Sequence, residues 1–290
     1  MSGRIKLPHG CVESPRKLAQ VQNPLENVRT IKFARWANPF FKSSSRTPPN
    51  ATTRRVPDGT VVYCVGDIHG RNDLLREMAE RVAADLKTQS FEHAVTIFLG
   101  DYIDRGPDSK GVIERLASGD WPTSIIALAG NHEEFLTTFL EDAGFLDFWR
   151  SQGGLETLHS YGVNVGPALR GRDFEEVQAQ FTDRFPKHHR AFAEALEDSA
   201  VTGDYFFCHA GVRPGVALDR QDRGDLLTIR EPFLSSSAEH GKVIVHGHTP
   251  AAAPEMRRNR IGIDTGAYAT GRLTCLVLEE DRQRFLPAVS

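Results

Sequence analysis

Residues 60–70 read Thr-Val-Val-Tyr-Cys-Val-Gly-Asp-Ile-His-Gly, a β-branched apolar run that ends in a polar block flanked by glycines. The run predicts a short buried strand, and the apolar periodicity of residues 74–86 predicts a helix directly after it. An apolar run followed by a block rich in Asp, His, Asn and Gly occurs four more times. The five blocks occupy residues 66–70, 100–106, 130–133, 209–211 and 246–250.

Strands and helices alternate through the first half of the chain. Apolar runs at 94–99 and 124–129 predict two further strands, and amphipathic patterns predict the helices that follow them, at 108–117 and 132–140. This alternation is typical of βαβ units with a largely parallel sheet, which binds ligands beyond the carboxyl ends of its strands. The first three blocks would meet there. Strands are expected again at 204–208, 243–245, 260–263 and 273–278.

Residues 144–200 contain none of the polar blocks. Aromatic and aliphatic side chains recur there at helical spacing, so we predict a helical insertion that packs beside the site. We expect residues 56–290 to form one domain that includes this insertion, and residues 1–55 to form a separate N-terminal extension.

The N-terminal extension is basic, with eleven Lys/Arg against two Asp/Glu, whereas residues 56–290 carry 24 Lys/Arg against 36 Asp/Glu. Its Pro, Ser, Asn and Thr content predicts disorder. Residues 28–41 mix aromatic with basic side chains. We favour a solvated tail that packs a few aromatics onto its own domain. Weak docking on a protein or an anionic membrane surface, or an organelle transit peptide, are the alternatives.

The amino-acid composition limits which binding partners and which cellular compartment are expected for the protein. An acidic domain argues against nucleic acid as the main partner, because duplex binding relies on basic groups that neutralise phosphates. No apolar stretch reaches the roughly 18 to 20 residues of a membrane span, and no secretory signal is expected. The four cysteines show no Cys-x-x-Cys spacing, so neither a thiolate metal site nor a disulfide framework is expected. We therefore expect a cytoplasmic protein that holds multivalent cations.

The blocks offer carboxylate, imidazole and amide oxygen ligands but no sulfur. Asp67 and His69 are one residue apart, so both side chains can point to the same side of an extended strand end. This ligand set suits Mn, Fe, Zn or Co, and a pair of such ions could polarise a phosphoryl oxygen. A single histidine would more often be structural, but six ligand-competent residues at strand ends need a common explanation. They are Asp67, His69, Asp101, Asn131, His209 and His248.

The five blocks, in this order, resemble those of the metallo-dependent phosphatases, and specifically the phosphoprotein phosphatase group that contains the serine/threonine protein phosphatases. The resemblance covers roughly residues 60–280 and is closest to bacterial and phage members. It implies an α/β fold of two packed mixed β-sheets flanked by helices, an αββα sandwich, with the site at the sheet edge.

The resemblance also implies how the ligands divide between two divalent ions, for which Mn²⁺ is expected. The first ion would be held by Asp67, His69 and Asp101. The second would be held by Asp101, Asn131, His209 and His248. Asn131 would contact the substrate phosphate as well. His246 and Asp264 are expected close to these ligands without a role of their own.

Further residues take catalytic or phosphate-binding roles by the same resemblance. His132 would be the general acid, and Asp104 would pair with it, since a carboxylate favours imidazolium. Arg105 would clamp the phosphate, because a guanidinium fork suits two phosphate oxygens. Arg230 would be a second phosphate-contacting arginine, although Thr228 stands where many members have Trp.

The expected activity is removal of phosphate from phosphoserine or phosphothreonine in proteins by direct attack of a metal-bound hydroxide. Two alternatives remain: a dinucleoside polyphosphate hydrolase of the diadenosine tetraphosphate type, and a phosphatase of broad specificity that also accepts phosphotyrosine. Asp104 and Glu133 resemble the protein phosphatases more than the dinucleoside polyphosphate hydrolases. An inactive scaffold is disfavoured, because every ligand and the acid are present.

Overall fold

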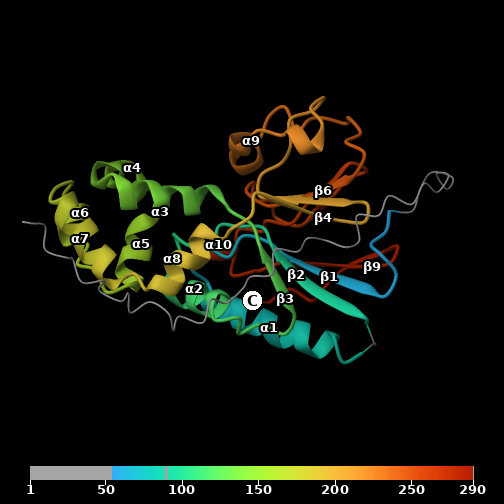
Figure 1. The fold of residues 1–290 in the computed structure, drawn as a ribbon, viewed down its shortest axis with the longest axis horizontal. Helices are drawn as coiled ribbons and strands as arrows, with labels where there is room; N and C mark the ends of the chain where they lie inside the picture. The colour runs from blue at the N-terminus through green and yellow to red at the C-terminus, as the bar shows by residue number, and fades with distance from the viewer. Residues whose placement is uncertain (1–53, 89–90, 290) are drawn as a thin grey trace, which may run out of the picture. The chain divides into compact units, whose positions relative to one another are not determined.

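The computed structural model describes residues 54–88 and 91–289, in which two five-stranded mixed sheets pack together (Figure 1). The first sheet contains, in spatial order, β10 (Arg282–Phe285), β9 (Cys275–Glu279), β1 (Thr60–Val65), β2 (His93–Phe98) and β3 (Ser124–Ala127). The second contains β4 (Ser199–Thr202), β5 (Tyr205–Cys208), β6 (Val243–His246), β8 (Arg260–Gly262) and β7 (Glu255–Met256). Each has three adjacent parallel strands, β1-β2-β3 and β5-β6-β8, with antiparallel strands beside them.

Helices follow the first three strands and then form the insertion. The first three are α1 (Asn72–Asp85), α2 (Ser109–Ala117) and α3 (Asn131–Glu141). The insertion contains α4 (Leu146–Trp149), α5 (Gly154–Ser160), α6 (Gly166–Leu169), α7 (Phe174–Arg184) and α8 (Lys187–Glu194), with 3-10 turns at Ala143–Phe145 and Arg150–Gln152. A further 3-10 turn at Leu218–Arg220, α9 (Arg223–Thr228) and α10 (Ala267–Thr270) complete the helices of the described residues.

Alternating side chains of the strands build the layers. Tyr63 on β1 packs with the α1 and α2 side chains, whereas its neighbour Cys64 faces the second sheet and packs with Phe207. On the second sheet, Phe206 packs outward against Leu226 of α9. Figure 1 shows α1 and α2 along the outer face of the first sheet and α9 beyond the second. The predicted αββα sandwich is confirmed.

All seven predicted strands and the three predicted helices before the insertion are present, with ends displaced by at most two residues. The insertion is helical as predicted, but its last residues, 199–200, belong to β4. The short strands β4, β7 and β10 were not predicted. Each pairs through one neighbour only, and edge strands such as the Arg-Gln-Arg-Phe of β10 need no apolar alternation.

The predicted N-terminal extension lies outside the described residues except for its last two. Arg54 forms an ion pair with Glu239 at 3.1 Å, and the backbone N–H of Arg55 donates to Asp204 at 3.0 Å. These two residues therefore contact the second sheet's connections and belong to the domain. No described helix is long and apolar enough to cross a membrane.

Candidate active site

The polar blocks lie where strands end, and the backbone turns there in unusual conformations. Seven described residues other than glycine have positive φ, and five of them are block residues, with φ between 46° and 72°. Such conformations are costly outside glycine and are concentrated at functional sites. The five residues are His69, Asp101, Asp104, Arg105 and His248.

Two glycines allow the blocks to approach one another closely. A Cβ atom on Gly106 would lie 2.0 Å from the carbonyl oxygen of His69, and one on Gly247 would lie 2.0 Å from Oδ1 of Asp67. Neither position can accept a side chain without displacing a block. The glycines of the motifs are therefore required by the contact between blocks.

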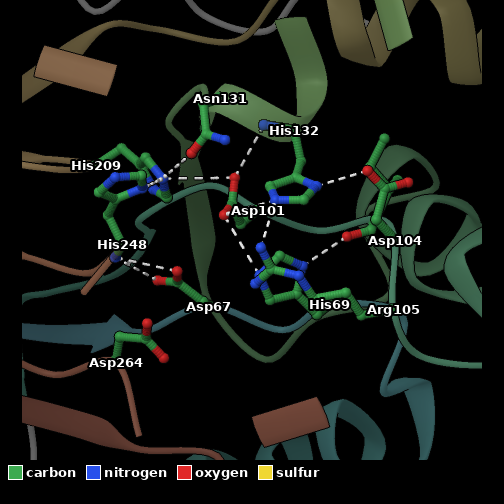
Figure 2. Close-up of polar contacts among 12 residues, drawn as sticks. Asp67, His69, Asp101, Asp104, Arg105, Asn131, His132, His209, His248 and Asp264 are labelled. Atoms are coloured by element: carbon green, nitrogen blue, oxygen red, sulfur yellow. Dashed lines mark hydrogen bonds and ion pairs between the residues drawn. The ribbon is translucent and has the colours of Figure 1, made fainter. Parts of the chain in front are cut away.

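Asp101 occupies the centre of the site (Figure 2) and is 2% exposed. Its Oδ1 lies 3.4 Å from Nε2 of His209 and accepts a hydrogen bond from the backbone N–H of His132 at 3.1 Å. Its Oδ2 lies 3.4 Å from Nε2 of His69. Burial would raise the pKa of this carboxyl, but the surrounding imidazoles outweigh burial and lower it. One ionised carboxylate therefore faces ligands from both sheets.

The tautomers of two histidines follow from their hydrogen bonds. Nδ1 of His69 donates to the carbonyl oxygen of Ile103, and Nδ1 of His209 donates to that of Leu99, both at 2.8 Å. Each Nε2 is then left with a lone pair beside Asp101. Burial lowers the pKa of both rings, to about 3 for His69. Nε2 of His209 faces oxygen atoms of Asp101 and Asn131, and a metal cation between these atoms would satisfy them. Nε2 of His69 faces Asp101 and also accepts a hydrogen bond from Arg105.

A second group of acceptors meets at His209. Its Nε2 lies 3.1 Å from Oδ1 of Asn131 and 3.2 Å from Nδ1 of His248. The backbone N–H of His248 donates to Oδ2 of Asp67 at 3.0 Å, which links the first block to the last. All six predicted metal ligands are therefore brought together. Among the described residues around this centre, two groups of side chains could each hold a metal ion, and Asp101 belongs to both. The first group is His69, Asp101 and His132, and the second is Asp101, His209 and His248.

Two further carboxylates concentrate negative charge beside these ligands. Burial, and then the charges of Asp264 and Asp101, raise the pKa of Asp67. Burial also raises the pKa of Asp264 to about 6, with the charge of Asp101 adding to it. Carboxylates this close and this buried are stabilised by cations. Together with the acceptor lone pairs, they fit a pair of divalent ions that share Asp101.

His132 and Asp104 form a buried pair on the other side of Asp101. Nδ1 of His132 lies 2.6 Å from Oδ2 of Asp104. Burial alone would lower the pKa of His132, but the carboxylates of Asp101 and Asp104 outweigh burial, so the pKa is raised. The insertion holds Asp104 in place: Nε1 of Trp149 donates to Oδ2 at 2.7 Å, and Oγ1 of Thr157 donates to Oδ1 at 2.6 Å.

Arg105 spans the two histidines. Its Nη1 donates to Nε2 of His69 at 2.7 Å, and its Nη2 donates to Nε2 of His132 at 2.9 Å. The insertion also contacts this residue, since the backbone N–H of Arg105 donates to the carbonyl oxygen of Gly153 at 3.1 Å. The ring of Tyr268 lies 4.9 Å from the guanidinium carbon.

Arg230 is exposed and follows α9. The pKa of His248 is lowered to about 3 by burial and then by the charge of His209, and the charge of Arg230 adds to this effect. The predicted second arginine thus lies near the ligands from the second sheet. His246, in contrast, is buried with its ring 5.1 Å from that of Phe233, and it donates from Nδ1 to the carbonyl oxygen of Gly247.

Sequence reasoning missed four residues that complete the site. Glu133 belongs to the third block, but no role in holding the site was expected for it. Its carboxylate accepts from the backbone N–H groups of Gly130, Asp101 and Tyr102 at 2.8 to 2.9 Å, so it ties the second block to the third. Burial and then the charge of Asp101 raise its pKa to about 7. The other missed residues are Trp149, Thr157 and Tyr268, which lie outside every block.

Comparison with known proteins matches residues 60–279 to the family described as calcineurin-like phosphoesterase. A Halalkalibacterium halodurans protein named bis(5'-nucleosyl)-tetraphosphatase PrpE, asymmetrical, is 27% identical over 236 residues, which are 74% of this chain and 89% of that protein. A Nitrosospira multiformis protein named bis(5'-nucleosyl)-tetraphosphatase, symmetrical, is 25% identical over 267 residues, 77% of this chain and 94% of that protein. A crystal structure of a protein provisionally named diadenosine tetraphosphatase shares the fold, with a TM-score of 0.54, 20% identity, and coverage of 83% of this chain and 96% of that one.

Proposed function

The chain belongs to the calcineurin-like phosphoesterase family, and within it we propose that the protein hydrolyses dinucleoside polyphosphates of the diadenosine tetraphosphate type. The names of the two bacterial relatives, whose own lengths are covered to 89% and 94%, support a nucleotide substrate. They favour this alternative over the phosphoprotein substrate that the block resemblance favours when taken alone.

Two exposed aromatic side chains beside the phosphate-binding residues carry the proposal. Tyr268 on α10 is 40% exposed and packs on Arg105. Phe148 on α4 is 47% exposed and lies 5.2 Å from Phe135, whose ring is 5.0 Å from that of His132. Proteins commonly hold bases by stacking them on aromatic rings. Two such rings at one phosphate site suit a substrate with a base at each end of a phosphate chain.

The contacts of Arg105 suggest how substrate binding would prepare the acid. With its Nδ1 proton donated to Asp104 and its Nε2 accepting from Arg105, His132 is neutral in this arrangement. A phosphate is a better partner for guanidinium than a neutral imidazole is, so the substrate would draw Arg105 away. Nε2 of His132 would then take a proton from solvent water, which the nearby carboxylates favour, and donate it to the leaving oxygen.

The ligands around Asp101 would hold two divalent ions, with Mn²⁺ as the proposed native metal. Bound there, such ions would supply Lewis acidity and an activated water. Arg230 is proposed as a second phosphate contact at the second-sheet side, supported by its proximity to His248. Asn131, beside His209, would contact both a metal and a phosphate oxygen.

Hydrolysis of phosphoserine and phosphothreonine in proteins is the second candidate. The pair of His132 and Asp104 favours it, because a serine or threonine alkoxide is a poor leaving group that needs a positioned acid. A polyphosphate leaving group needs that proton less. Activity on phosphotyrosine would be an extension of this second candidate.

A substrate panel tests the proposal. The purified full chain, with Mn²⁺ added, would be given diadenosine tetraphosphate, phosphoserine, phosphothreonine and phosphotyrosine peptides, and p-nitrophenyl phosphate. We expect kcat/KM for the dinucleotide to exceed that for each peptide by about tenfold or more, as a site built for a second base should discriminate. Asp101→Asn serves as the inactive control. A higher kcat/KM for the phosphoserine or phosphothreonine peptide would overturn the proposal in favour of the second candidate.

The aromatic contacts can be tested separately with Tyr268→Ala. Loss of one stacked base should raise KM for diadenosine tetraphosphate about 5- to 100-fold, with little change in KM for p-nitrophenyl phosphate. Leu169→Ala is a matched control, since Leu169 is another exposed apolar side chain, 63% exposed on α6. Equal changes in KM for both substrates would show that Tyr268 positions Arg105 and does not bind a base.

A further inference from the structure

A third group of metal-ligating side chains lies outside the site described above. Nε2 of His188 and Nε2 of His189 lie 3.0 Å and 2.9 Å from the same oxygen of Glu114, Oε2. Glu114 lies on α2, which follows the second block, and the two histidines are neighbours on α8 of the insertion. The three ligand atoms lie within 4.8 Å of one another.

The two histidines converge although helical neighbours normally point in different directions. Successive residues on a helix are separated by about 100°, so adjacent side chains do not usually share a partner. Here the rings meet edge to face with centroids 4.4 Å apart. The side chain of His189 is fully buried, whereas those of His188 and Glu114 are 49% and 53% exposed. The group thus has one fixed ligand and an open, adjustable face toward solvent.

Tyr161 supports the buried histidine from behind. Its hydroxyl lies 2.8 Å from Nδ1 of His189. A hydroxyl can accept from Nδ1–H, and the proton would then be absent from Nε2, the atom that faces Glu114. Histidines that ligate metals through one nitrogen almost always have the other held by such a partner, which fixes the ring and its tautomer.

We propose that Glu114, His188 and His189 form a third metal site, for Zn²⁺, that is separate from the catalytic pair and joins α8 to α2. Two imidazole nitrogens and one carboxylate oxygen are typical zinc ligands, and water would take the fourth position. Zinc–ligand bonds of about 2.0 to 2.2 Å place tetrahedral ligand atoms about 3.3 Å apart. The observed 2.9 and 3.0 Å separations from Oε2 need a small outward shift of Glu114, and the exposed His188 would adjust the separation of the two Nε2 atoms, which lie within 4.8 Å of each other.

The site would link the insertion to the second block. α2 begins at Ser109, whose Oγ accepts from the backbone N–H of Asp104 at 3.1 Å and contacts Oγ1 of Thr157 at 3.0 Å. A metal between α2 and α8 would therefore stabilise the same junction that holds Asp104. Lys110, one turn before Glu114 on α2, lies with its ammonium 6.0 Å from the Tyr161 ring and opposes a cation at this position. Lys110→Gln should accordingly bind zinc more tightly.

The test compares zinc binding of the full-length wild-type protein with that of the full-length His188→Asn variant. Both are loaded with Mn²⁺, titrated with free Zn²⁺ and analysed for retained zinc by elemental analysis, with Tm recorded in parallel. His159→Asn, an exposed histidine on α5, is the matched control. We expect the wild-type protein and the His159→Asn control to retain about one equivalent more zinc than His188→Asn. The bound zinc should raise the Tm of these two proteins by at least about 2 °C. Turnover without zinc should be the same in all three.

Further variants keep the proposal open to refutation. Glu114→Gln, exposed like His188, should lose the same equivalent, and Tyr161→Phe should weaken zinc binding about 10- to 100-fold. Equal zinc content in folded wild-type, His188→Asn and Glu114→Gln proteins would overturn the proposal. A zinc dissociation constant above about 1 mM would also overturn the proposal, since a specific zinc site in a protein binds more tightly than this.

Discussion

The proposed metal ligands around Asp101 come from strand ends of both sheets, whereas the pair of His132 and Asp104 depends on the insertion. Asp101 is held through Glu133, a residue of the third block. Asp104, in contrast, accepts hydrogen bonds from Trp149 and Thr157, which are 45 and 53 positions away in the chain. The proposed metal ligands are thus held by contacts between the polar blocks, and the proposed acid depends on hydrogen bonds from the insertion. The two parts should respond differently to substitution.

Asp101→Asn should have the largest effect, because Asp101 faces both groups of ligands. An amide in its place removes a charge and turns one acceptor into a donor. We expect metal content to fall below two equivalents and kcat to fall by about 10⁴-fold or more, as activation of water is lost. Elemental analysis and kinetics with Mn²⁺ would measure both. Two retained metals with near-normal kcat would contradict the central place of Asp101.

His132→Asn should leave metal content unchanged and lower kcat by about 10² to 10⁴-fold, the usual contribution of a positioned acid. The loss should be greatest for alkyl phosphates and smaller for aryl phosphates and polyphosphates, whose leaving oxygens need the proton less. Kinetics on the three classes would show the trend. The same loss on all of them would mean that His132 does not donate the proton.

Asp104→Asn should lower kcat by less, about 10- to 100-fold, and change its dependence on pH. The carboxylates raise the pKa of His132, so the acid stays protonated to higher pH and activity falls only as pH rises through that pKa. Without the charge of Asp104 the pKa falls, and the basic limb of the pH–kcat profile should move to lower pH. An unshifted basic limb would assign that limb to another group.

Trp149→Phe should have the smallest effect, a loss of kcat of about threefold to tenfold with full metal content, since only one hydrogen bond to Asp104 is removed. Trp121→Phe is a matched control, because Nε1 of Trp121 donates to Thr96 at 2.7 Å away from the acid pair. Both variants should lose similar stability in thermal unfolding. If the control lost as much kcat as Trp149→Phe, the effect would be one of stability alone.

The strands and the clustering of the proposed metal ligands could be predicted from the sequence, because both follow from local signals. Apolar runs end at polar blocks, and parallel strand ends meet at one edge, so Asp67, Asp101 and Asn131 had to be near one another. The ligands His209 and His248 follow the same rule in the second sheet. The edge strands β4, β7 and β10 carry no such signal, since only one side of each is paired.

The surroundings of the proposed acid, His132, could not be predicted, because they depend on where the insertion folds back. Nothing in the residues around Trp149 or Thr157 distinguishes them from core side chains, and both are in fact buried. No sequence pattern marks Tyr268 as a site residue either, because its position beside Arg105 arises from the short helix α10. Tertiary contacts of this kind have no periodicity to reveal them.

One contact limits how freely the insertion can be exchanged among relatives. Gly153 has φ of 99°, its carbonyl oxygen accepts from the backbone of Arg105, and a Cβ atom there would lie 2.6 Å from the Arg105 nitrogen. A chimera that grafts another insertion onto this scaffold would have to reproduce a glycine at this point. Any other residue there would displace the backbone of Arg105, and the proposed phosphate contact would be lost while the proposed metal ligands stayed in place.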